Sequence, residues 1–279
     1  MVLKPISALW LVLATAPVRG ADSIPPATLG LDLGYRQMYN LQFDDAHKTF
    51  HEWNQSHPSD PLALTSDAAA FLFSEFDRLG VLQSELFVDD AAFENHGKLT
   101  PDPAAKQGFE AAVEASDRLA DQVLARDPRD CNALFAKVLN QGMRADYAAL
   151  VEKRNLAALS YTKRAGVLAQ RLLAIDSSYY DAYLAVGIEN YILSLKPAPV
   201  RWLLRVYGAE TDRNEGIAKL QLTAAKGHYM VPYARLLLAV AALRDKDTAQ
   251  ARQLLTGLAQ EFPNNRLYVR ELARLDQGH

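Results

Sequence analysis

The sequence predicts an all-α protein built from about five antiparallel helix pairs, and three observations lead to this prediction. Acidic or hydroxyl residues stand before proline at several places, as they do where helices begin. Apolar residues then return at helical spacing. No run of alternating β-branched residues is long enough for a sheet. With 279 residues, 49% of them hydrophobic, the chain is long enough to bury a substantial core.

The expected helix starts can be followed along the chain. The steps before proline are Asp60-Pro61, Thr100-Pro101, Asp102-Pro103 and Asp127-Pro128. Several of them suit an N-cap followed by proline in the first turn. Near the C-terminus, Asp247 and Gln250 form a capping-box pattern. The last strong helix is predicted after it, from the apolar spacing of Leu254, Leu255, Leu258 and Phe262.

Two stretches far apart in the chain repeat the same order of residues. In residues 33–58, the pair Leu33-Gly34 belongs to one helix, and a second helix, lined by Ala46, Phe50 and Trp53, ends at Pro58. In residues 238–263 the corresponding residues are Leu238-Ala239, then Ala251, Leu255, Leu258 and Pro263. The small residues of such a repeat let helices approach closely, and the large ones fill the space between helix pairs.

This pattern resembles the tetratricopeptide repeat (TPR), an antiparallel helix pair of about 34 residues. The resemblance implies a right-handed solenoid over residues 30–279. Middle units fit through Tyr183 and Val186-Gly187, through the stretch ending at Pro128, and through Ala165 and Leu172. Inserted segments at about 78–101 and 193–213 interrupt the spacing.

The second insert, with its flanks, has a resemblance of its own. Asn190, the run Leu193-Ser194-Leu195, Gly208, and Asp212-Arg213 before Gly216 are similar to the helix-interrupting stretch of the inclusion-body-clearance family of TPR proteins. This chain lacks much of that family's length, so the resemblance implies a likeness of architecture only.

The first twenty residues predict export. Lys4 supplies a positive start, residues 6–16 an apolar run, and residues 18–20 a small-residue exit. The apolar run is shorter than the roughly 20 residues of a membrane span. We therefore expect a signal peptide at 1–20, a linker at 21–29, and a periplasmic or secreted protein; an uncleaved anchor is the alternative. Cys131 is the single cysteine, so packing rather than a disulfide must hold the fold together.

The histidines raise the question of a metal site. His47 and His51 are four positions apart, a spacing that suits two ligands on one helix face. They lie to the side of the seam formed by Ala46, Phe50 and Trp53, and the remaining histidines are scattered. We interpret them as surface residues of a repeat. The alternative, a metal-dependent hydrolase, predicts stoichiometric metal in the purified protein.

Other signals favour a binding protein over an enzyme. The sequence has no nucleophile elbow, no phosphate-binding glycine loop, no dinucleotide fingerprint and no Cys-x-x-Cys pair. The formal net charge is −3, without a block of like charge, so we expect no nucleic-acid partner and at most peripheral membrane contact. No cofactor is indicated.

The expected function is protein–protein interaction. In a curved solenoid the first helix of each pair lines the concave face, where aromatic, Arg and Asn side chains suit an extended peptide or a partner helix. The predicted partner-binding residues are Tyr35, Met38, Tyr39, Asn140, Arg144, Tyr147, Ile188 and Tyr191. Two alternatives remain open at this point. The tyrosines could instead be packing residues, and the groove could bind a small ligand or an envelope polymer.

Overall fold

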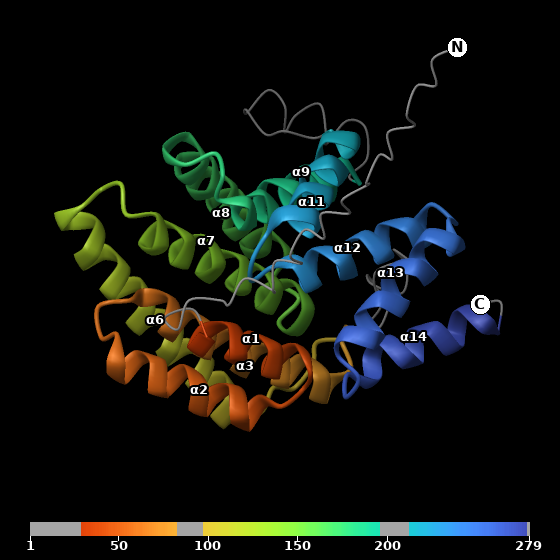
Figure 1. Cartoon of the computed structure of the whole chain (residues 1–279), viewed down its shortest axis with the longest axis horizontal. Helices are drawn as coiled ribbons and strands as arrows, with labels where there is room; N and C mark the ends of the chain where they lie inside the picture. Colours follow the sequence, from red (N-terminus) through yellow and green to blue (C-terminus); the bar gives the residue numbers. More distant parts are fainter. Residues whose placement is uncertain (1–28, 83–96, 196–211, 278–279) are drawn as a thin grey trace, which may run out of the picture.

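The computed structural model describes residues 29–82, 97–195 and 212–277 (Figure 1). Within these ranges there are eleven α-helices and no strand, which confirms the all-α prediction. A π-helical turn, η1 (Tyr147–Val151), and a 3-10 turn, η2 (Tyr180–Ala182), add to them. The helices are α1 (Leu29–Tyr39), α2 (Phe43–Ser56), α3 (Pro61–Leu79), α6 (Pro103–Arg126), α7 (Cys131–Asp146), α8 (Asn155–Ile175), α9 (Tyr183–Ser194), α11 (Arg213–Lys226), α12 (Val231–Arg244), α13 (Thr248–Glu261) and α14 (Arg266–Asp276).

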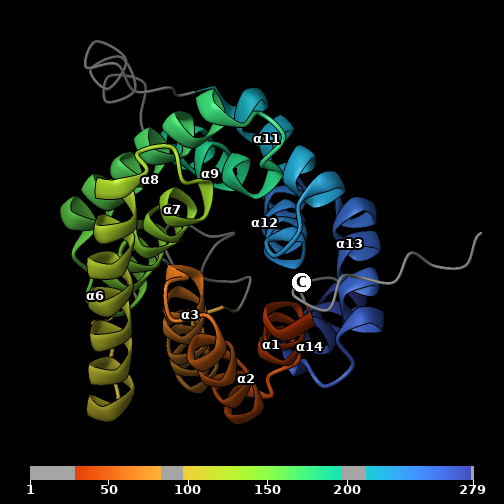
Figure 2. The same ribbon diagram turned by 60° about the vertical axis from the view of Figure 1, so that its left-hand side comes forward.

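The helices pack as five successive pairs followed by a single helix. The pairs are α1/α2, α3/α6, α7/α8, α9/α11 and α12/α13, and α14 packs on α13. Figure 2 shows them along an arc, with α3, α7, α9 and α12 on its inner side and α6, α8, α11 and α13 on its outer side. The five helix pairs predicted from the repeat pattern are therefore present.

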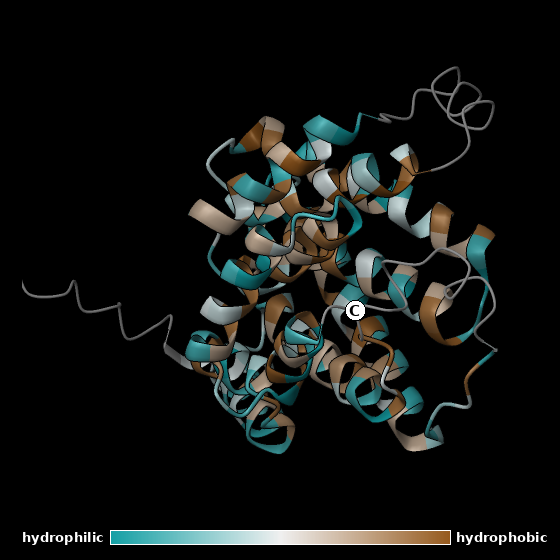
Figure 3. Ribbon diagram, turned by 90° about the vertical axis from the view of Figure 1, so that its right-hand side faces the viewer, coloured by the Kyte–Doolittle hydropathy of each residue, from teal (hydrophilic) through white to brown (hydrophobic). Residues whose placement is uncertain are grey.

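Small residues set the distance between paired helices, as the sequence predicts. A Cβ atom added to Gly34 of α1 would lie 2.2 Å from the Phe50 ring of α2, which is fully buried. Gly187 and Gly216 play this part between α9 and α11, since a Cβ on Gly216 would lie 2.7 Å from the backbone nitrogen of Tyr191. Figure 3 shows apolar and polar residues interspersed along the helices rather than confined to separate helices, as expected where each helix packs through one side only.

The predicted helix starts are confirmed at three of the marked positions. Asp60, Asp102 and Asp247 are N-caps whose side chains accept hydrogen bonds from backbone N–H groups of the first turn. Asp127 instead ends α6, and Asp130 is the residue that caps α7. Thr100 lies in the extended segment before α6.

Both predicted inserts lie between the two helices of a pair, after α3 and after α9. Residues 83–96 and 196–211 of these inserts lie outside the described residues, as do the predicted signal peptide and all of the linker except Leu29, which begins α1. None of the described helices combines the length and the apolar character that crossing a membrane requires.

The described chain closes on itself, which the repeat pattern does not predict. Residues of α1 contact the loop before α12 and the start of α14, although these segments are about 190 to 226 positions apart in sequence. The terminal helices thus contact each other instead of leaving an open solenoid.

Candidate functional site

The contact between the two ends of the chain, called here the closing seam, is built from Tyr35, Tyr39, Tyr229, Phe262 and Asn265. The rings of Tyr35 and Tyr229 stack with centroids 4.6 Å apart, and Tyr39 packs on Phe262 at 5.6 Å. The Tyr39 hydroxyl donates to the Tyr229 carbonyl at 3.0 Å, and Asn265 Nδ2 donates to the Tyr39 carbonyl at 2.8 Å. Ring stacking and hydrogen bonds together hold this seam.

A buried carboxylate fixes the loop that carries Tyr229. Asp181 accepts hydrogen bonds from the backbone N–H groups of His228, Tyr229 and Met230, at 2.8 to 3.1 Å. Burial raises the pKa of the Asp181 carboxyl, and the three N–H donors counter that rise. The loop therefore presents Tyr229 to α1 in a fixed position.

Three predicted partner-binding residues belong to this region and do not line an open groove. Tyr35, Met38 and Tyr39 are all buried, with at most 7% of their surface exposed. Ser66 of α3 donates a hydrogen bond to the Tyr35 hydroxyl at 3.1 Å, and burial raises the pKa of Tyr35 and Tyr39 above the ordinary tyrosine value. The expectation of exposure is wrong because the C-terminal helices cover this face of α1.

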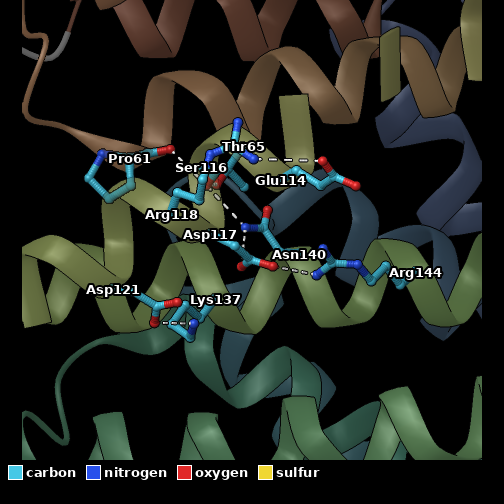
Figure 4. Close-up of polar contacts among 10 residues, drawn as sticks. All are labelled: Pro61, Thr65, Glu114, Ser116, Asp117, Arg118, Asp121, Lys137, Asn140 and Arg144. Carbon is cyan, nitrogen blue, oxygen red and sulfur yellow. Dashed lines mark hydrogen bonds and ion pairs between the residues drawn. The ribbon is translucent and has the colours of Figure 1, made fainter. Parts of the chain in front are cut away.

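Asn140 and Arg144 are also tied to neighbouring helices rather than presented to a partner (Figure 4). Asn140 is fully buried, and its Nδ2 donates to Ser116 at 3.0 Å and to Asp117 at 2.9 Å. Arg144 forms an ion pair with Asp117 at 2.6 Å. Ser116 in turn bonds Thr65 of α3 at 2.7 Å. This α3–α6–α7 network uses the polar groups that the sequence suggested for binding.

Tyr147 lies in the π-helical turn and is buried. Its ring stacks on Phe109 at 5.4 Å, and Lys106 Nζ lies 5.7 Å from the ring centroid. Its buried hydroxyl has no hydrogen-bond partner among the described residues, and burial raises the pKa of Tyr147 to about 12. Tyr147 is therefore a packing residue in this conformation.

The last two predicted residues lie on α9. Ile188 is partly buried against the core, and Tyr191 is 8% exposed. The guanidinium of Arg213 lies 5.7 Å from the Tyr191 ring centroid. Through Arg213, Tyr191 adjoins a pocket.

That pocket lies among the start of α11, the end of α12 and the start of α13, and has a volume of about 260 Å³. Leu238, Ala241 and Ile217 form its apolar floor. Asn214 and Gln250 stand exposed at its rim. The sequence did not predict this site because its residues come from three helices and follow no motif. The two small residues Ala241 and Ala242, one turn after Leu238, are the sequence feature that could have indicated a pocket.

One side of the pocket is closed by an ion pair. Nη2 of Arg213 donates to both carboxylate oxygens of Asp245, and this salt bridge ties the start of α11 to the end of α12. The Asp245 carboxylate raises the pKa of the Arg213 guanidinium, which therefore stays charged. The two charges offset each other, which leaves hydrogen bonding and apolar contact as the forces available to a ligand.

His47 and His51 are more than surface residues. Both face the buried carboxylate of Asp67 on α3, at 2.6 Å and 3.3 Å. The His47 ring packs on Phe71 with centroids 4.1 Å apart, whereas the His51 side chain is 60% exposed. Over the described ranges, no group of three or more His, Cys, Asp or Glu residues is arranged to hold a metal ion.

Comparison with known proteins adds little to this geometry. No family model matches the chain, and no curated protein matches it. A thermophilic TPR protein from Thermus thermophilus, known from a crystal structure, is 18% identical to this chain with a TM-score of 0.46. That match covers 89% of this chain and 98% of the other. Such a similarity is too low to transfer a function.

Proposed function

We propose that the chain is an exported scaffold, not an enzyme, and that it binds another protein at the pocket between α11, α12 and α13. The observation behind the proposal is a pocket that combines apolar lining with two exposed amide side chains, Asn214 and Gln250. An amide side chain both donates and accepts, as a peptide backbone does.

The size and charge of the pocket favour a peptide over a cofactor-sized ligand. Its volume of about 260 Å³ lies below the roughly 300–1,000 Å³ of sites that enclose drug-sized ligands. One apolar side chain of an extended segment would fill the floor formed by Ile217, Leu238 and Ala241, while Asn214 and Gln250 bond the flanking peptide groups.

The alternative of an anionic envelope polymer fits less well. A polymer site would favour free Arg or Lys side chains on the inner face, and Arg144 is paired there with Asp117. Arg213, beside the pocket, is likewise paired, with Asp245. The export part of the proposal comes from residues 1–20 alone; mass spectrometry of the protein from its native host would contradict it if residues 1–20 were retained and the chain stayed in the cytosol.

The binding proposal is tested by closing the pocket. A cross-linked pull-down of the tagged mature chain from its native cell envelope supplies a candidate partner, whose affinity is then measured with purified proteins. Gln250→Trp places a bulky ring at the rim, and Gln260→Trp makes the same change at another exposed glutamine of α13. We expect Gln250→Trp to weaken binding at least tenfold and Gln260→Trp to leave it unchanged. Equal affinities of both variants and the unaltered chain would contradict the proposal.

A further inference from the structure

A second feature lies on the inner side of the arc, at the end of α7. Asp146 is the last residue of this helix, and its carboxylate accepts a hydrogen bond from the Tyr233 hydroxyl of α12 at 3.2 Å. The residue keeps part of its surface exposed. Across the described ranges, no Lys, Arg or His side chain forms an ion pair with it. Among the described residues, Asp146 therefore has no counter-cation.

The surroundings of Asp146 are aromatic on one side and open on another. The ring of Phe73, from α3, meets the Tyr233 ring edge to face at 5.6 Å. One helical turn before Asp146, on the same face of α7, stands Gly142, and a Cβ atom added there would meet no atom of the described residues within 4 Å. This face of α7 therefore has open space one turn before the carboxylate.

The environment of the Asp146 carboxylate favours a positively charged ligand. Burial raises the pKa of the Asp146 carboxyl to about 7, while the Tyr233 hydrogen bond lowers it. Tyr233 is the titratable side chain that Asp146 contacts, and Phe73 carries no charge. A cation would offset the cost of burying the carboxylate and would also be attracted to the aromatic rings.

The kind of cation follows from the donor set. A divalent metal takes about six oxygen ligands, whereas a single carboxylate and a single phenol stand here. An ammonium group is satisfied by a carboxylate and aromatic faces. We propose that Asp146, Tyr233 and Phe73 form a binding site for an alkylammonium group, supplied either by a free amine or by a lysine side chain of a partner. This site is separate from the α11–α13 pocket and does not depend on it.

Binding of two probes to the mature chain tests the site by calorimetry: the diamine putrescine and the capped peptide acetyl-Gly-Lys-Gly-amide. We expect saturable binding at pH 8 that Asp146→Asn weakens at least tenfold. Asp44→Asn, which removes an exposed carboxylate from the first turn of α2, should leave it unchanged. Tighter binding of the diamine would indicate a free amine as the guest, and tighter binding of the peptide a protein side chain.

Two further measurements keep the proposal falsifiable. Gly142→Leu fills the open space while improving helix propensity, so it should abolish binding in a folded protein. Lowering the pH from 8 to 6 should weaken binding about tenfold, because only the ionised carboxylate attracts the amine and its pKa is about 7. The absence of saturable binding by both probes, or equal binding by the unaltered chain and Asp146→Asn, would overturn the proposal.

Discussion

The polar α3–α6–α7 network and the closing seam are two contacts of the same fold with different origins. The network joins neighbours in the repeat order through short side chains, such as Ser116, Asn140 and Asp117. The closing seam joins the two ends of the chain through large rings, Tyr35 on Tyr229 and Tyr39 on Phe262. The first contact is local and would be present in any stack of these helices. The second exists only because the arc curves far enough for its ends to meet.

This difference predicts two kinds of response to mutation. Loss of a network residue breaks contacts among three central helices and should lower the stability of the whole domain. Loss of a seam residue should open the ends first and leave the centre folded, because the pairs between them keep their own contacts.

The largest effect is expected for Asp117→Ala. This change removes the partner of Arg144 and a hydrogen-bond acceptor of the buried Asn140. A charge left unpaired in a mostly buried site is costly, and we expect a loss of about 2–4 kcal/mol in the free energy of unfolding. Urea denaturation would measure it.

The matched control for that change is one turn further along α6. Asp121 pairs with Lys137 at 2.6 Å, but its side chain is 66% exposed. Asp121→Ala should therefore cost less than about 1 kcal/mol. Equal losses for the two variants would show that the network contributes no more than a surface ion pair.

An intermediate effect is expected at the closing seam, for Asn265→Ala. The change removes the bond to the Tyr39 carbonyl and the N-cap of α14, whose side chain accepts from the Leu267 N–H. We expect a cost of about 1–3 kcal/mol. Hydrogen exchange should speed up in α1 and α14 and stay slow in α6 and α7.

The neighbouring Asn264 serves as the control, because it is exposed and contributes only its backbone N–H to the Asn40 side chain. Asn264→Ala should leave exchange unchanged in all four helices. If Asn265→Ala sped exchange equally in α6 and α7, the seam and the centre would form one cooperative unit.

An effect opposite in sign is expected for Asp146→Asn. The folded-state pKa of Asp146 is about 7, above the ordinary aspartate value of about 3.9. The folded protein thus binds more protons than the unfolded chain between these values, and stability falls as pH rises through this window.

Asp146→Asn removes this pH dependence and should be more stable than the unaltered chain at pH 8, by up to about 4 kcal/mol for a shift of about three pKa units, with little difference at pH 4. Thermal unfolding at both pH values would measure it. A variant less stable than the unaltered chain at pH 8 would contradict the assigned shift.

The sequence predicted the helix pairs because each pair is determined by local spacing. Gly34 and Phe50 lie on consecutive helices, and Ala251 and Leu255 lie one turn apart on a single helix. The spacing of such residues along the sequence is sufficient to predict the helix pairs. The positions of the inserts followed in the same way, from interruptions of that spacing. The caps at Asp60, Asp102 and Asp247 were likewise marked by residues adjacent in sequence.

The candidate site could not be predicted in this way. Whether Tyr35 and Tyr39 face solvent or Tyr229 depends on the summed rotation of five helix pairs, and small differences at each pair add up. The same residue types, aromatic rings with polar tips, suit an exposed groove and a buried seam equally well. The pocket beside Arg213 is formed by residues of three helices, and its amide residues Asn214 and Gln250 belong to no sequence motif.

The central claim is that the two ends of the chain meet, which the distance between them in solution tests most directly. Spin labels at the exposed positions Arg36 of α1 and Arg270 of α14, in a Cys131→Ser background, would report it by double electron–electron resonance. A closed chain predicts a single narrow distance distribution that widens when Asn265→Ala is introduced. A long, broad distribution in the chain with Asn265 intact would contradict closure and return Tyr35 and Tyr39 to an open face.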